Sequence, residues 1–217
     1  MTSEETIGAL FPKRVVAMAK RAATEPGVAR EPRFVVPQSP AEDKCRMFLE
    51  QLRWPEGARC PRCDAHKGIS RIESRGQFEC GVCGYQFSVR VGTIFHASHL
   101  PLWKWFLAVY VIAESRDGIS ANQLMRMLDI SYKTAWYLTH RVRAAMRDDA
   151  ARPRSRLNEA DQVALARMGH KGKHLSAYRD EQEFRAKNRG NPYLFRDMLS
   201  RLIGVDAMPY TQLIASA

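Results

Sequence analysis

The amino-acid sequence predicts a mainly α-helical protein with a small β ribbon. In chain order we expect a helix, the ribbon, a helix-turn-helix bundle and a C-terminal helical tail. Three observations predict this fold: cysteines in two close pairs, apolar residues at helical spacing after residue 100, and serine and glycine residues where helices would begin and end.

The composition indicates a globular, basic protein. The chain has 217 residues, of which 45% are hydrophobic, enough for a buried core. Its 34 lysines and arginines exceed its 23 acidic residues, and the net charge of +11 favours a polyanionic partner such as nucleic acid over a membrane surface. No run of about 18 apolar residues occurs, and Glu4 and Glu5 stand where a signal peptide would carry positive charge. We therefore expect a soluble, cytoplasmic protein with no membrane partner.

Four cysteines form the most specific motif. Cys60 and Cys63 make one pair, and Cys80 and Cys83 make a second pair after sixteen intervening residues. Two residues between thiolates let both sulfurs of a tight turn reach one ion at about 2.3 Å, and a hairpin between the turns brings the pairs face to face. Two disulfides or a redox pair are the alternatives, but these are typical of exported proteins and of parallel-sheet folds, respectively. The pattern predicts a structural Zn2+ held by four thiolates, with no open coordination position.

The residues around these cysteines predict the strands of a ribbon. Residues 69–74 and 77–79 are expected to be short strands, and residues 85–89 alternate apolar and polar side chains as a third strand would. Cys45 lies apart on an expected helix and is interpreted as a core residue. His66 could compete as a ligand, although an exposed turn position is the favoured interpretation. The expected fold is thus mainly α with a small β zinc ribbon.

A helix is expected to begin at Ser39 and to form one unit, residues 39–98, with the zinc ribbon. Pro40 suits a first helical turn, and the acidic residues that follow favour the positive end of the helix dipole. We expect this helix to pack on the ribbon, and its one apolar face consists of Cys45, Phe48, Leu49 and Leu52.

Residues 1–38 are expected to be a flexible N-terminal arm and linker. Ile7 to Ala23 could form a short basic helix broken near Pro12, and residues 25–37 are rich in proline. Terminal segments of this kind are commonly mobile.

Residues 99–147 carry the signals of a helix-turn-helix. The aromatic run from Leu102 to Ser115 predicts a buried helix that ends before Gly118. Ser120 would cap a second helix through Leu128, and Ser131 would cap a third helix that runs to Met146. A three-residue turn between two helices is typical of the helix-turn-helix, whose second helix enters the major groove of DNA.

The third helix of this bundle carries the candidate DNA contacts. Ala135, Leu138, Val142 and Ala145 fall at helical spacing and should face the core, which leaves the aromatic and basic residues outside. The alternative is a basic solvent-facing surface with no ligand. The sequence predicts double-stranded DNA as the partner and the following contact residues: Ser131, Tyr132, Lys133, Thr134, Trp136, Tyr137, His140, Arg141 and Arg143.

Several motifs together resemble a known family. They are the run from Cys45 to Cys63, Phe87–Phe95 (FSVRVGTIF), Pro101–Phe106 (PLWKWF) and Ser131–Trp136 (SYKTAW). They resemble, in the same order, the front end of zinc-ribbon insertion-sequence transposases of bacteria. The resemblance runs from about Ser39 to Met146 and resumes at Lys173–Arg189, which looks like the helix that closes the catalytic domain in that family. The resemblance implies that the protein recognises DNA and that it is associated with the bacterial nucleoid.

The resemblance also implies a catalytic domain that the spacing leaves no room for. Family members carry between these matches an RNase-H-like domain whose acidic residues hold two divalent ions. Here residues 148–172 form an expected linker, and one strand-helix-strand unit already needs some thirty residues. We therefore expect no catalytic residue and no enzyme activity. The expected protein is a sequence-specific DNA-binding regulator or accessory factor.

Two other functions stay open at this point. The chain could be an active transposase or nuclease component, with its carboxylates supplied by a partner chain or by Asp148, Asp149, Glu159 and Asp161. It could instead be a zinc-stabilised protein-interaction module.

Residues 173–217 are expected to be a C-terminal helical remnant of the family's longer chain. Phe195, Met198, Leu199 and Leu202 would form one apolar helical face, followed by the segment Pro209–Ile214. This face could dock on the helix-turn-helix or pair two chains into a homodimer, with folding back on the same chain as the alternative.

Overall fold

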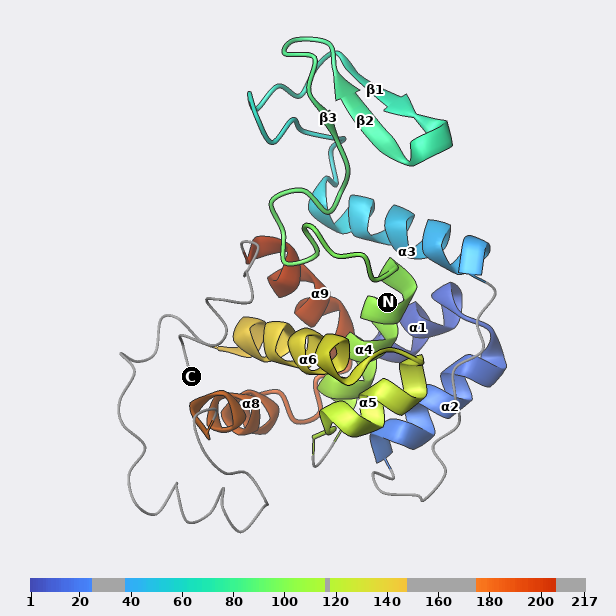
Figure 1. Cartoon of the computed structure of the whole chain (residues 1–217), viewed down its shortest axis with the longest axis vertical. Coiled ribbons are helices and arrows are strands. Elements are labelled where there is room, and N and C mark those ends of the chain that lie inside the picture. The colour runs from blue at the N-terminus through green and yellow to red at the C-terminus, as the bar shows by residue number, and fades with distance from the viewer. Residues whose placement is uncertain (25–37, 116–117, 148–174, 206–217) are drawn as a thin grey trace.

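The computed structural model describes residues 1–24, 38–115, 118–147 and 175–205, which form a small β ribbon above a larger helical domain (Figure 1). A three-stranded antiparallel sheet in the order β1-β2-β3 makes up the ribbon. The mainly α fold with a small β ribbon is confirmed. The elements are α1 (Ser3–Leu10), α2 (Lys13–Thr24), α3 (Gln38–Arg53), β1 (Ile69–Ile72), a 3-10 turn (Glu73–Arg75), β2 (Gln77–Cys80), β3 (Gln86–Phe87), α4 (Leu102–Glu114), α5 (Ala121–Leu128), α6 (Tyr132–Met146), α8 (Leu175–Lys187) and α9 (Leu194–Gly204).

Helix α4 is the centre of the helical domain. Eleven of its 13 residues are buried, because α2, α3, α6 and α9 all pack around it. A helix that is apolar on every side must be covered on every side. Glu42 of α3 fixes the start of α4, because the Glu42 carboxylate accepts a hydrogen bond from the backbone N of Trp103 at 3.2 Å.

The N-terminal segment differs from the mobile arm that was expected. Helices α1 and α2 bury Ile7, Leu10, Val15 and Ala19 in the main core, where α2 lies against α4 and α1 against α9. Their spacing of three or four residues gives each helix an apolar stripe, and burial of such a stripe stabilises a helix that would be marginal alone. Residues 1–24 therefore belong to the helical domain. The proline-rich stretch at 25–37 lies outside the described residues.

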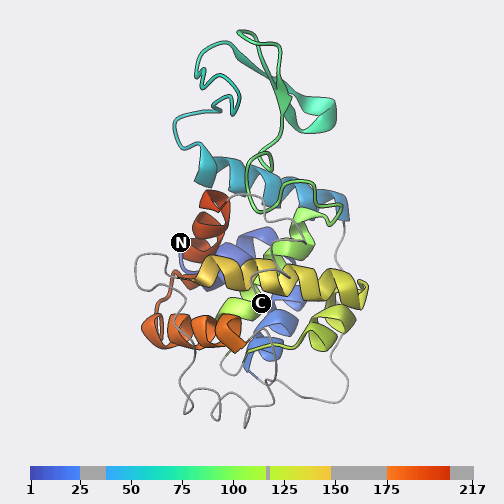
Figure 2. The ribbon, with the colours of Figure 1, turned by 60° about the vertical axis from the view of Figure 1, so that its left-hand side comes forward.

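Helix α3 packs on the ribbon, as expected, and also on the helical domain. Its apolar residues Cys45 and Leu49 are buried in the core of the helical domain. Glu50 and Arg53 of α3, and Trp54 just after it, contact the ribbon. Figure 2 shows α3 lying between the two parts as a platform.

The predicted helix-turn-helix is formed by α5, a short turn and α6. Ser120 caps α5 in a capping box with Gln123, and Ser131 caps α6 by accepting from the backbone N of Thr134 at 3.1 Å. Asp129, in the turn, has a left-handed backbone conformation with φ of 52°. The cap positions agree with those expected from serine spacing.

The C-terminal helices fold back into the same domain. The apolar face of α9 is buried against α4, α6, α3 and α1, so it docks on the second helix of the helix-turn-helix and folds back on the same chain. Phe195 meets Phe106 and Tyr110 edge-on, at centroid distances of 6.0 and 5.6 Å. Because this face is already covered within one chain, it offers no surface for the homodimer that was considered. The expected linker at 148–172 and the segment Pro209–Ile214 lie outside the described residues.

No helix within the described ranges combines the length and apolar character needed to cross a membrane.

Candidate zinc centre and nucleic-acid interface

Two tight turns at one end of the ribbon present the four paired cysteines. In the first turn the backbone N of Asp64 donates to the carbonyl oxygen of Cys60 at 2.9 Å, and in the second the N of Gly84 donates to that of Cys80 at 2.8 Å. Asp64 and Gly84 both have left-handed backbone conformations, with φ of 61° and 67°. Each turn thereby points two thiols to the same side.

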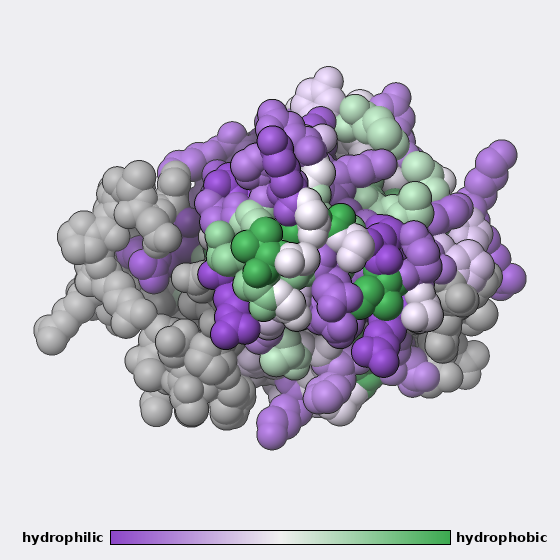
Figure 3. Space-filling model, turned by 90° about the horizontal axis from the view of Figure 1, so that it is seen from above, coloured by the Kyte–Doolittle hydropathy of each residue, from purple (hydrophilic) through white to green (hydrophobic). Residues whose placement is uncertain are grey.

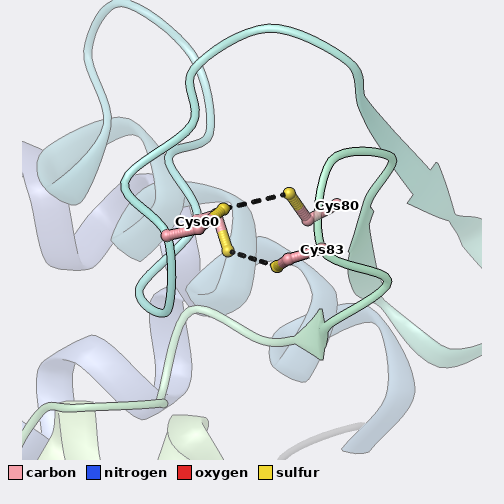
Figure 4. Close-up of side chains that lie close together, drawn as sticks. Cys60, Cys80 and Cys83 are labelled. Carbon is pink, nitrogen blue, oxygen red and sulfur yellow. Dashed lines mark hydrogen bonds between the residues drawn. The ribbon is translucent and has the colours of Figure 1, made fainter.

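The sulfur atoms lie at the spacing that a tetrahedral zinc ion requires. All four fall within 4.8 Å of one another, with Cys60 Sγ 3.7 Å from Cys83 Sγ and Cys63 Sγ 3.6 Å from Cys80 Sγ. Four thiolates at about 2.3 Å from one ion would lie about 3.8 Å apart, whereas a disulfide needs about 2.05 Å. Figure 4 shows Cys80 and Cys83 facing Cys60 across the gap. The cysteine set fits a structural zinc ion, as predicted.

Local hydrogen bonds favour the metal-binding form of Cys60. Burial tends to raise the pKa of this thiol, but the backbone N–H groups of Cys63 and Arg62 donate to its sulfur and lower its pKa to about 7. Cys45, by contrast, is fully buried in the helical core, and burial raises its pKa. His66 is exposed and lies outside the cysteine cluster, which agrees with its interpretation as a turn residue.

The ribbon has a small core of its own. Phe87 is buried and stacks on Phe78 at a centroid distance of 5.7 Å, while Trp54, just after α3, meets both rings edge-on. From the ribbon end the surface is mostly hydrophilic with small apolar patches (Figure 3), and Val82 between the second pair of cysteines is 70% exposed. A core this small requires the metal for its stability.

Ion pairs fasten the ribbon to α3. Arg71 on β1 contacts Glu50 on α3 at 2.6 Å, and Arg90, after β3, contacts Glu42 at 2.5 Å. Arg53 at the end of α3 donates to the carbonyl oxygen of Val89 at 2.6 Å. Burial raises the pKa of Glu50, against the opposing effect of Arg71. The zinc turns are thus held at the far end of a sheet that is anchored at its base.

These features define the class of protein: a four-cysteine zinc ribbon joined to a helical domain that contains a helix-turn-helix. Residues 40–86 match the family of the transposase zinc-ribbon domain. A protein of Halobacterium salinarum, described as an uncharacterized protein in transposable element ISH50, is 37% identical over 116 residues, which cover 52% of this chain and 38% of that protein. The chain thus spans less than two-fifths of that relative. No solved structure matches the chain. The match over residues 40–86 agrees with the resemblance seen in the sequence.

The N-terminal half of α6 is the accessible part of the expected DNA-contacting face. Ser131, Tyr132 and Lys133 are exposed, with 51% of Tyr132 accessible. Thr134, Trp136 and Tyr137 are half-buried. These six of the predicted contact residues lie together on the first turns of the helix.

The C-terminal half of the same face is not accessible, which corrects the prediction for three residues. His140, Arg141 and Arg143 are 5%, 2% and 4% exposed. Arg141 lies over the rings of Trp105 and Tyr137, at 5.5 and 4.9 Å, and burial lowers its pKa. Basic residues usually lie on the surface, and no local pattern in the sequence indicates that α4 and α8 cover this half of α6.

Sequence reasoning also missed the acidic side chain that pairs with one of these basic residues, Arg143. Glu181 on α8 contacts Arg143 at 2.6 Å and also pairs with Arg185. Burial alone would raise the pKa of Glu181, but the two guanidinium groups outweigh it and hold the pKa below its usual range. An acidic residue flanked by apolar positions at helical spacing was the available signal, since Phe184 follows Glu181 by three residues and is buried.

Proposed function

We propose that this protein binds double-stranded DNA at specific sequences and reads bases with the N-terminal half of α6. The observation that carries the proposal is the exposed cluster of Ser131, Tyr132 and Lys133 at the start of the second helix of a helix-turn-helix. In such motifs the N-terminal residues of the second helix meet the base edges in the major groove.

The charges at this helix start support an anionic partner. The first turn of α6 contains no acidic residue, although acids there would stabilise the helix. It contains Lys133 instead, close to the positive end of the helix dipole. A cation at this position costs a little stability, whereas a phosphate or a guanine base edge would be well placed beside it.

We propose further that the protein acts as a regulator or accessory factor and does not itself cut DNA. The support is the short interval between Arg147 and the start of α8, which is too short for a multi-stranded catalytic sheet. Asp148, Asp149, Glu159 and Asp161 fall within this interval and outside the described residues.

The second candidate is a component of DNA transposition. It is favoured by the transposase zinc ribbon and by a relative from a transposable element, of which this chain spans 38%. Cleavage of a duplex by the purified protein in the presence of Mg2+ would establish this alternative, because two-metal strand cleavage needs a carboxylate cluster. The control is a variant in which Asp148, Asp149, Glu159 and Asp161 are all changed to Asn or Gln.

Selection of duplexes from a random pool, followed by sequencing, tests the proposal. The zinc-loaded full chain is expected to enrich one motif. Retention of all duplexes alike, with affinity governed only by salt, would contradict sequence-specific reading. Weak binding indifferent to sequence would favour the interaction-module alternative.

A further inference from the structure

A buried carboxylate joins the recognition helix to a helix far along the chain. Glu181 on α8 is 3% exposed. Its Oε2 accepts from Nε of Arg143 on α6 at 2.6 Å, and its Oε1 accepts from Nη2 of Arg185. Arg143 is itself 4% exposed. A buried carboxylate stays ionised only where opposite charges replace the water it has lost, and here two guanidinium groups do so. We call Arg143, Glu181 and Arg185 the Glu181 cluster.

The same cluster reaches the last turn of α4 and the start of the helix-turn-helix. Nη2 of Arg185 donates to the carbonyl oxygen of Ile112 at 2.6 Å. Gly118, in the turn before α5, has a left-handed φ of 82°, and a Cβ there would lie 3.4 Å from Oε1 of Glu181. One carboxylate therefore lies where α4, the turn before α5, α6 and α8 meet.

Aromatic contacts continue this junction along α6. The guanidinium of Arg143 lies 4.2 Å from the ring centroid of Tyr178 on α8, and the ring of His140 meets Tyr178 edge-on at 6.5 Å. His140 in turn contacts Trp136 at 4.2 Å. Figures 1 and 2 both show α8 lying along α6. These ring contacts link α8, through His140, to Trp136 in the accessible N-terminal half of α6.

We propose that Glu181 is a positioning residue for DNA reading and that α8 is part of the DNA-binding unit. This inference rests on the proposed DNA-binding function. Lys133 lies ten positions before Arg143, a distance of about 15 Å along a helix. A tilt of about 5° at the Glu181 cluster would shift Lys133 by about 1 Å, and base reading requires placement within roughly 0.5 Å. Contacts made by the exposed half of α6 therefore depend on how the covered half is held.

The test compares Glu181→Gln with wild type in the full, zinc-loaded chain, using the duplex that wild type selects and a scrambled duplex. The variant keeps the shape of the side chain and removes its charge. Glu181→Gln is expected to bind the selected duplex roughly tenfold more weakly, and the scrambled duplex within about twofold of wild type. A positioning effect lowers the ratio of the affinity for the selected duplex to the affinity for the scrambled duplex. A lower concentration of folded protein would instead weaken both affinities equally and leave this ratio unchanged.

Glu183→Gln is the matched control, because it removes a carboxylate that is 48% exposed from the same helix. It is expected to bind both duplexes as wild type does. Hydrogen exchange of the free proteins gives a readout without DNA: amides of α6 should exchange faster in Glu181→Gln, and those of the ribbon at the wild-type rate.

Tyr178→Leu supplies a second variant should Glu181→Gln not fold. It removes the ring beneath Arg143 and keeps apolar volume, and a smaller loss of the same affinity ratio is expected. A folded Glu181→Gln that binds the selected duplex as tightly as wild type would overturn the inference while leaving the DNA-binding function intact. If Glu181→Gln does not fold, an unchanged ratio in Tyr178→Leu has the same meaning. If wild type selects no duplex, the proposed function itself fails, and this inference with it.

Discussion

The zinc ribbon and the helical domain are built around cores of very different size. In the described part of the ribbon the buried apolar cluster consists of Cys60, Cys80 and Phe87, whereas α4 alone buries eleven residues in the helical domain. A small sheet with so little apolar burial depends on the ion, while the helices have a core of their own. We therefore expect the ribbon and the helical domain to unfold separately. Zinc orders the ribbon and does not set the arrangement of the helices.

Removal of zinc should produce the largest effect and confine it to the ribbon. Binding of a structural zinc is worth about 10 kcal/mol or more, and this energy is folding energy for such a site. With a chelator, or in Cys80→Ser, NMR signals of residues 60–87 should collapse to unfolded positions while those of α4 to α6 persist. Cys45→Ala is the control, because this cysteine lies in the helical core and should not change zinc content. Simultaneous loss of both sets of signals would show that the two parts are one cooperative unit.

Truncation of one phenylalanine in each core should sharpen the comparison. Phe195→Ala should lower the free energy of unfolding of the helical domain by about 3–5 kcal/mol, because a buried ring is lost and a cavity remains. Phe87→Ala should instead weaken zinc binding and leave the helical transition in place. Urea unfolding followed by far-UV circular dichroism, with zinc content measured in parallel, separates the two results. Loss of zinc from Phe195→Ala would contradict the separation.

Acid should weaken the helical domain through Glu181. Because the folded state holds the pKa of this carboxyl below its value in the unfolded chain, near 4.3, its stabilisation is complete above that pH and is lost as the pH falls. Each pKa unit of depression is worth about 1.4 kcal/mol. Urea midpoints of the helical transition should fall below about pH 4 in wild type and in Glu183→Gln. In Glu181→Gln the decline should be shallower, and an identical decline would assign it to other groups.

The smallest effect should come from the cap of α5. Ser120 accepts from the backbone N of Gln123, whose side chain accepts in return from the backbone N of Ser120. Ser120→Ala should cost about 1 kcal/mol of helical stability and leave zinc binding unchanged. Ser70→Ala on β1, where the residue is exposed, is the matched control in the ribbon. A change of zinc affinity in Ser120→Ala would indicate coupling between the two parts.

Local features of this molecule could be predicted from its sequence. Metal ligation needs two residues between thiolates, and capping needs a serine beside the first turn, so both can be identified within a few residues. The zinc centre, the ribbon and the starts of α5 and α6 followed from such rules. Each depends on neighbours in the chain and not on the global fold.

Contacts between distant segments could not be predicted in the same way. Arg141 and Arg143 were placed on the surface because isolated arginines usually lie there. Trp105 of α4 lies against Arg141, however, and α8, from beyond residue 174, covers Arg143. Helices α1 and α2 could have been recognised as packed elements from the spacing of Ile7 and Leu10 in α1 and of Val15 and Ala19 in α2. Their position at the end of the chain favoured a mobile arm instead.

In the proposed function, the exposed half of α6 reads DNA. The most direct test of this reading is a titration of wild type, Lys133→Ala and Tyr132→Ala against the duplex that wild type selects and a scrambled duplex. Each substitution should weaken binding to the selected duplex by about 1–3 kcal/mol and relax its sequence preference, while zinc content and melting temperature stay at wild-type values. Unchanged affinity for the selected duplex in both variants would place the reading surface elsewhere on the molecule.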